Sequence, residues 1–168
     1  GEEGELRPLF SKARVIFSLD SDFLGTDGAT LEATREFTRG RQIDPGDKAA
    51  NLSRLYVAES SMTVTGSNGD HRIPLRPSAS LDLARALLDG VAGNEEALHE
   101  TAQLHHLDLQ TLLALASDLR NNPGASLVVA GPHLPEAVHA VVCSINHALG
   151  APGKTLAWNE APPTLPVN

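Results

Sequence analysis

The residues best suited to chemistry lie in a loop that follows a short apolar run. This loop, 19–28, reads LDSDFLGTDG and joins the apolar run to a helix-forming segment. Glycines at such a junction, Gly25 and Gly28, allow backbone N–H groups to approach a phosphate. The spacing is not GxGxxG, and the carboxylates of Asp20 and Asp22 would repel an anion unless they point away. A phosphate-binding loop and a solvated loop built from Asx turns therefore both stay open.

A further acidic residue, Glu59, ends the next apolar run, LSRLYVAE. In doubly wound nucleotide-binding domains, an acidic residue at this place accepts hydrogen bonds from ribose hydroxyls. A carboxylate exposed at a strand end would give the same pattern. The segment 60–70 that follows is rich in Ser, Thr, Gly and Asn, which predicts a loop.

The histidines and the single cysteine predict neither a metal site nor a nucleophile. His139, Cys143 and His147 are spaced by four residues on one predicted helix. Because eight helical residues rise about 12 Å, one ion cannot contact all three, and we expect Cys143 to be buried in the helix packing. One cysteine excludes an internal disulfide and an iron–sulfur cluster held by this chain alone. With no GxSxG elbow either, we predict no catalytic residue.

The charge balance argues against two classes of partner. The chain has 168 residues, with 21 acidic side chains against 13 Lys and Arg, and a net charge of −8. Nucleic acids and anionic membranes are bound through clustered Lys and Arg, so neither is expected. No apolar run approaches the roughly 20 residues that cross a bilayer, which predicts a water-soluble chain without membrane insertion. The opening, GEEGELRPLF, shows no signal-peptide pattern and suggests a domain excised from a longer protein.

Alternating strands and helices must position these residues. Strands are predicted at 14–20, 52–59, 72–76, 126–130 and 155–158, and helices at 31–39, 81–88, 95–104, 109–120 and 135–149. Ser80, Asn94 and Asp108 are the predicted N-caps. The alternation predicts a doubly wound α/β fold of Rossmann-like type, with a mostly parallel sheet of about four to five strands flanked by helices. We assign 1–12 to a linker, 13–160 to a single domain and 161–168 to a tail.

Three segments together resemble a known family. The most specific is 55–77, LYVAESSMTVTGSNGDHRIPLRP, and the others are 18–24, SLDSDFL, and 128–133, VVAGPH. They resemble the molybdopterin-oxidoreductase-like region of the B subunit of alternative complex III, which is related to the dimethyl sulfoxide reductase superfamily. The likeness runs from about Arg14 to Trp158, most of the chain.

The resemblance implies a domain that holds part of a guanine-dinucleotide pterin. The family pattern has Asp-Pro-Arg after one strand, Ala-Asp before a short strand, and Arg-Pro-Gly-Thr-Asp opening a helix. Glu59 and Ser60 stand at the Asp-Pro, Asp70 at the Asp before the short strand, and Arg76 at the Arg of Arg-Pro. The family's Gly-Thr-Asp is replaced by 78–80, Ser-Ala-Ser.

That replacement removes a guanine-contacting carboxylate, because Ser80 offers one uncharged hydroxyl. A lost hydrogen bond to a charged group is worth about 1.5–3 kcal/mol. The resemblance therefore implies a vestigial or low-affinity cleft, although the alternative of a working molybdopterin guanine dinucleotide site stays open. The candidate cofactor-binding residues are Asp20, Asp22, Gly25, Gly28, Glu59, Ser60, Asp70, Arg76 and Ser80.

The resemblance also implies a role and a location. We expect a structural scaffold without its own cofactor, fused to iron–sulfur clusters elsewhere in a parent chain that is an oxidoreductase subunit. Its partners would be other domains of that chain and the subunits of a membrane-bound, quinol-oxidising respiratory complex, on the periplasmic side of the inner membrane. The domain alone is not expected to be catalytic.

Overall fold

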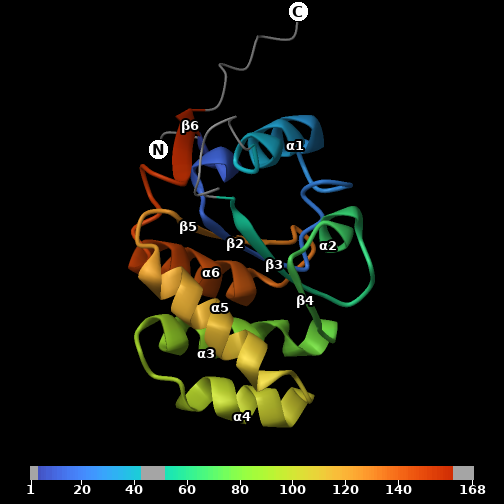
Figure 1. Ribbon diagram of the computed structural model, residues 1–168, viewed down its shortest axis with the longest axis vertical. Helices are drawn as coiled ribbons and strands as arrows, with labels where there is room; N and C mark the ends of the chain where they lie inside the picture. Colours follow the sequence, from blue (N-terminus) through green and yellow to red (C-terminus); the bar gives the residue numbers. More distant parts are fainter. Residues whose placement is uncertain (1–3, 43–51, 161–168) are drawn as a thin grey trace, which may run out of the picture.

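A parallel sheet of four strands lies at the centre of the protein (Figure 1). The computed structural model describes residues 4–42 and 52–160. The sheet has the order β4-β3-β2-β5, with β2 at Val15–Leu19, β3 at Arg54–Glu59, β4 at His71–Pro74 and β5 at Ser126–Ala130. All three strand pairs are parallel, which confirms the predicted α/β fold. Pro74 lies on the edge strand β4, where a missing N–H is tolerated.

Helices cover both faces of this sheet. On one face lie α1, Thr30–Arg39, and the 3-10 helix η1, Phe10–Lys12. The other face carries α3, Ser80–Val91, α5, Leu109–Asn121, and α6, Glu136–Ala148. Helix α4, Glu96–His105, packs against α3 and α5, further from the sheet (Figure 1).

Side chains that alternate along β2 enter two separate cores. Phe17 packs with the cluster formed by α3, α4, α5 and α6, whereas Ile16 packs with the cluster that contains Phe10, Phe23 and Phe37. Because successive side chains of a strand point to opposite faces, a strand buried along its whole length needs cover on both sides.

The strand order creates a switch point between β2 and β5. From β2 the chain continues to β3 and then β4 on one side, and it returns to place β5 on the other side of β2. Loops that leave two such strands diverge to opposite faces of the sheet, and open α/β sheets bind ligands in the resulting crevice.

One of the three predicted helix caps forms, because Asp108 is the N-cap of α5 whereas the N-caps of α4 and α3 are Glu95 and Ala79. The Asp108 side chain accepts a hydrogen bond from the Thr111 N–H at 2.9 Å. The Asn94 side chain accepts from the Glu96 N–H at 3.2 Å, but Asn94 lies one residue before the N-cap, which is Glu95. Ser80 caps nothing: α3 continues from the 3-10 helix η2, Pro77–Ala79, and Ser80 is its first residue. The preceding turn displaces Ser80 from the extended backbone that an N-cap needs.

A second, two-stranded sheet differs from the prediction. Residues 4–8, assigned to a linker, form β1, Gly4–Pro8, which pairs antiparallel with β6, Leu156–Glu160. The last predicted strand therefore belongs to this ribbon rather than to the parallel sheet. The sequence around 4–8 does not predict this strand, because a short polar segment becomes a strand only when it pairs with a partner that is distant in the sequence. The tail assigned to 161–168 lies outside the described residues. Within 4–42 and 52–160, no helix combines the length and apolar content needed to cross a membrane.

Candidate functional site

Asp20 lies at the switch point, immediately after β2. Its backbone has φ 49°, a left-handed conformation that is uncommon for a residue other than glycine and is often found at functional sites. Its Oδ1 accepts a hydrogen bond from the Ser60 N–H at 3.4 Å, and its Oδ2 lies 3.2 Å from Nε2 of His133. Gly131 permits this approach, because a Cβ there would overlap the Asp20 carbonyl oxygen. The switch point thus holds a carboxylate that orients an exposed imidazole.

The carboxylate of Asp22 is bound by donors from the chain itself. Its Oδ1 accepts hydrogen bonds from the N–H and the hydroxyl of Thr65, both at 2.9 Å, and its Oδ2 accepts from the Thr26 hydroxyl at 3.3 Å. Thr65 lies in a short helix, α2, Val64–Ser67, within the predicted loop. Burial alone would raise the pKa of Asp22, but the hydrogen bonds from Thr65 and Thr26 outweigh it and lower the pKa. Asp22 therefore stays ionised as an anchor for α2.

Glu59 ends β3 and its side chain is turned into the protein, with 1% exposed. Its Oε2 accepts from the Thr63 N–H at 3.2 Å and the Thr63 hydroxyl at 2.7 Å, and its Oε1 pairs with Nε of Arg72 at 2.5 Å. A Cβ at Gly66 would overlap this carboxylate, so glycine lets α2 pack against it. The carboxylate predicted to bind a ribose is thus held by three protein donors.

The two glycines of the first loop serve different purposes. The N–H groups of Gly25, Thr26 and Asp27 all donate to the Asp22 carbonyl oxygen, at 2.9, 2.9 and 3.0 Å. The Asp22 N–H in turn donates to Oδ2 of Asp27 at 2.8 Å. These groups form a self-contained turn rather than a cradle for a phosphate. Gly28, with φ 69°, lies further on, just before α1, beside a separate groove.

Asp70 lies near the amino ends of the strands, whereas Asp20 and Glu59 lie at their carboxyl ends. Its Oδ2 accepts a hydrogen bond from the Leu55 N–H at 2.8 Å, near the start of β3, and both oxygens pair with Arg41 at 2.7 and 2.8 Å. The Arg41 guanidinium lowers the pKa of Asp70 in spite of partial burial, and the Leu55 N–H adds to the effect. The structure therefore separates Asp70 from the other candidates.

Arg76 and Ser80 follow β4 on the carboxyl side of the sheet. Arg76 is exposed and forms no ion pair with a described residue. Ser80 is 1% exposed, and its hydroxyl has no hydrogen-bond partner within the described part of the chain. A ligand in solution could reach Arg76, but it could not reach the hydroxyl of Ser80.

The structure brings five of the predicted site residues together around α2, at the carboxyl ends of the strands, a place called here the edge around α2. They are Asp20, Asp22, Gly25, Glu59 and Ser60. The groups that hold these residues were not among the predicted site residues. They are Thr63, the N-cap of α2, Thr65 within α2, Arg72 from β4, and His133 after β5. A threonine three residues before a glycine, as in Thr63-Val-Thr-Gly66, is compatible with an N-cap, and the Thr63 hydroxyl does accept from the Gly66 N–H at 3.0 Å.

The histidine and cysteine stripe on α6 differs from the expectation of buried packing. Cys143 and His147 are exposed and His139 is partly buried. Helix α6 packs its other side, including Val138 and Ile145, against the core. Over the described ranges, no three His, Cys, Asp or Glu side chains gather close enough to hold one metal ion.

The protein is thus a doubly wound α/β domain. At the carboxyl ends of its strands, the carboxylates of Asp22 and Glu59 form hydrogen bonds and an ion pair with other residues of the same chain. Neither the known protein-family models nor the curated proteins match its sequence. Among solved structures it is similar to acetylene hydratase from Pelobacter acetylenicus, with a TM-score of 0.55 and 14% identity. The match covers 92% of this chain and 24% of that one, so this chain spans about a quarter of the enzyme's length. At this identity, the likeness shows a shared fold.

Proposed function

We propose that this chain is a molybdopterin-oxidoreductase-like domain that keeps the fold of its family and serves as a structural scaffold without a cofactor of its own. The observation that carries the proposal is the engagement of Asp22 and Glu59. Thr63, Thr65 and Arg72 satisfy both carboxylates at the edge where a nucleotide would lie. Groups that could contact a ligand satisfy one another instead.

The residues present do not fit a guanine-dinucleotide pterin. Guanine needs a carboxylate that accepts from two neighbouring N–H groups, and the family position for it is Ser80, whose hydroxyl is buried. The phosphates need free donors, and the N–H groups of 25–27 bond to their own loop. Asp70 lies near the amino ends of the strands, away from the other candidate residues. We therefore derive no step through this cofactor.

The neighbouring structure supports this proposal at the level of the superfamily. Acetylene hydratase is a molybdopterin enzyme of the dimethyl sulfoxide reductase superfamily. The sequence resemblance adds the finer part of the proposal: an iron–sulfur subunit of a quinol-oxidising respiratory complex, on the periplasmic side of the inner membrane. In that assembly the clusters lie elsewhere in the parent chain, and this domain contacts other domains and subunits.

One observation favours the alternative, a domain that binds molybdopterin guanine dinucleotide. Asp20 keeps a strained backbone at the switch point, beside the exposed His133, and Arg76 is free of described ion pairs along the same edge. Strain of this kind is frequent where a ligand binds. The contact between Asp20 and His133 also joins the loops that follow β2 and β5, which is enough to account for these two residues in a scaffold.

Elemental analysis of the parent protein, purified from its native source, tests the proposal. We expect iron, with no molybdenum or tungsten, while a molybdopterin enzyme taken through the same purification retains its metal. About one molybdenum or tungsten per chain would refute the scaffold role. A titration of the 168-residue chain with guanosine, which carries the base without phosphate groups, adds a direct test of the cleft, with no saturable binding expected up to about 1 mM. Tight, saturable guanosine binding would favour the alternative.

A further inference from the structure

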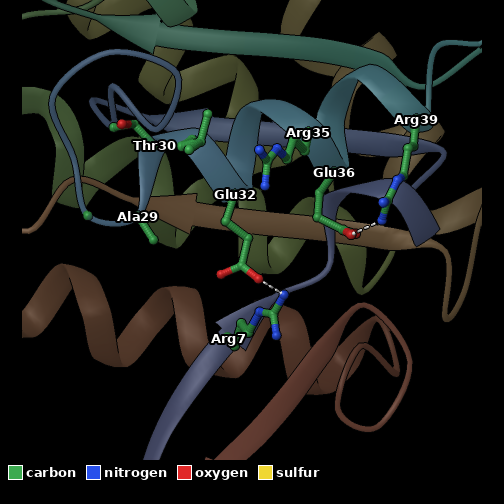
Figure 2. A pocket seen from close by; sticks show the side chains of 9 residues that line it. Arg7, Ala29, Thr30, Glu32, Arg35, Glu36 and Arg39 are labelled. Atoms are coloured by element: carbon green, nitrogen blue, oxygen red, sulfur yellow. Dashed lines mark hydrogen bonds and ion pairs between the residues drawn. The ribbon is translucent and has the colours of Figure 1, made fainter.

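A groove separate from the carboxyl edge lies between α1 and β1. Its volume is about 630 Å³, within the range of about 300–1,000 Å³ that small-molecule sites occupy. Figure 2 shows that Glu32, Arg35, Glu36 and Arg39 project from one side of α1, which faces Arg7 of β1. Residues three and four positions apart share a helix face, so the sequence places all four along the groove.

The arginines of the groove differ in how they are engaged. Arg7 pairs with Glu32, and Arg39 pairs with Glu36 at 3.1 Å. Arg35 forms no ion pair with any residue that the structure describes. Three guanidinium groups face two carboxylates, which leaves a net positive charge in the groove. A guanidinium exposed in a hollow can accept a planar anion with two parallel hydrogen bonds.

This local charge is opposite to that of the rest of the molecule. The chain has a net charge of −8, and the segment 80–148, which covers the other face of the sheet, has two arginines and eight acidic residues. An anion approaching the protein is therefore repelled by one layer and attracted by the groove on the other.

The two ion pairs do not block the groove. The side chains of Arg7 and Glu32 are 35% and 52% exposed, and Arg39 is 66% exposed. Exposed pairs of this kind contribute little to stability, so their arginines can turn to a stronger ligand. Glu36 accepts a hydrogen bond from the Ser11 hydroxyl and pairs with Arg39 rather than with Arg35. Leu31, 66% exposed beside the groove, offers apolar surface for the organic part of a ligand.

We propose that this groove is a binding site for a small polyanion carrying phosphate or carboxylate groups, with Arg35 as its main contact and Arg39 and Arg7 in support. The site is formed by α1 and β1 and shares no carboxylate with the edge around α2. It is therefore independent of the scaffold role proposed above.

Calorimetric titration of the purified 168-residue chain tests this site, with inorganic pyrophosphate and citrate as separate probes at constant ionic strength. We expect saturable binding with one ligand per chain. Arg35→Gln should weaken it by about ten-fold or more, since the contact is a charge-assisted hydrogen bond, and Arg35→Lys should restore part of the loss. The matched control is Arg85→Gln, which removes an exposed arginine of α3 on the other face.

The two probes separate the sources of the anion. Tighter binding of pyrophosphate supports a phosphate ligand, and tighter binding of citrate supports a carboxylate ligand. The proposal is overturned if neither probe binds saturably, if Arg35→Gln leaves binding unchanged, or if Arg85→Gln weakens binding equally. Circular dichroism of each variant confirms the fold, which exposed side chains should not disturb.

Discussion

Replacing Ser80 with alanine should stabilise the protein, whereas replacing it with aspartate should destabilise it strongly. Ser80 is 1% exposed, and its hydroxyl has no hydrogen-bond partner among the residues described. A buried polar group without a partner costs about 1–3 kcal/mol. Alanine is also the better helix former, by about 0.5 kcal/mol. Because the loss of one oxygen leaves a small void that offsets part of this gain, we expect Ser80→Ala to raise the free energy of unfolding by about 1 kcal/mol.

Ser80→Asp puts a carboxylate into the same buried position. Leaving a buried charge uncompensated costs about 3–5 kcal/mol, and the group responds by raising its pKa. The variant connects stability with the proposed function, since the molybdopterin-oxidoreductase-like family proposed for this chain has aspartate at this position. Ser78→Asp is the matched control, because Ser78 is exposed two residues earlier and should change stability by less than about 0.5 kcal/mol.

Urea unfolding followed by circular dichroism measures these effects, provided that the dependence on urea stays equal among the variants. In a domain of this size, 1 kcal/mol corresponds to a shift in Tm of about 2–4 °C. A loss of stability in Ser80→Ala would mean that the hydroxyl has a partner. A tolerated Ser80→Asp would mean that the position opens to solvent, and the cofactor-binding alternative would regain its acidic residue.

Three further perturbations test the contacts described above. Gly66→Ala should destabilise the protein by about 1–3 kcal/mol in urea unfolding, because its Cβ overlaps the Glu59 carboxylate; unchanged stability would contradict that packing. The lowered pKa of Asp70 means that its stabilising contribution is complete above the ordinary value of 3.8 and is lost as the pH falls toward the folded-state pKa. Asp70→Asn should therefore lower the free energy of unfolding at neutral pH and make its decrease at acidic pH less steep. An unchanged decrease at acidic pH would show that other groups dominate. Burial, and then the hydrogen bond to Asp118, raise the pKa of Tyr56 to about 12. Since the chain has one tyrosine, its phenolate absorbance should titrate near that pH, and Asp118→Asn should bring the midpoint closer to 10.0, whereas a wild-type midpoint at the ordinary value would refute the buried contact.

Elements whose signals are local could be predicted from the sequence. The continuous apolar runs around Phe17 and Tyr56 form the buried strands β2 and β3, and Asp108 caps α5 as its position before an apolar stripe suggests. The ribbon of β1 and β6 could not be predicted, because Leu6 and Trp158 become neighbours only after the chain has folded. Strand propensity in such short segments depends on the partner strand.

The candidate site shows the same division. Asp20 and Glu59 could be placed at strand ends from the apolar runs that precede them, and the structure puts both at one edge. The engagement of Glu59 could not be predicted, because it depends on the path of α2 between β3 and β4. Asp70 is different: it precedes a strand rather than following one, and in a parallel sheet that order alone predicts a place at the amino ends of the strands, away from Asp20 and Glu59.

Binding and folding compete at the edge around α2, but not in the groove beside α1. A nucleotide at the edge could reach Arg76, but any donor taken from Thr63, Thr65 or Arg72 would be lost to Asp22 or Glu59. A hydrogen bond to a charged group is worth about 1.5–3 kcal/mol. Glu59 would then be left buried beside Arg72 with fewer donors, which costs more than the contact itself returns. In the groove, Arg35 has no described partner to lose, so an anion there adds a contact without removing one. An anion bound in the groove would therefore leave the contacts around α2 intact.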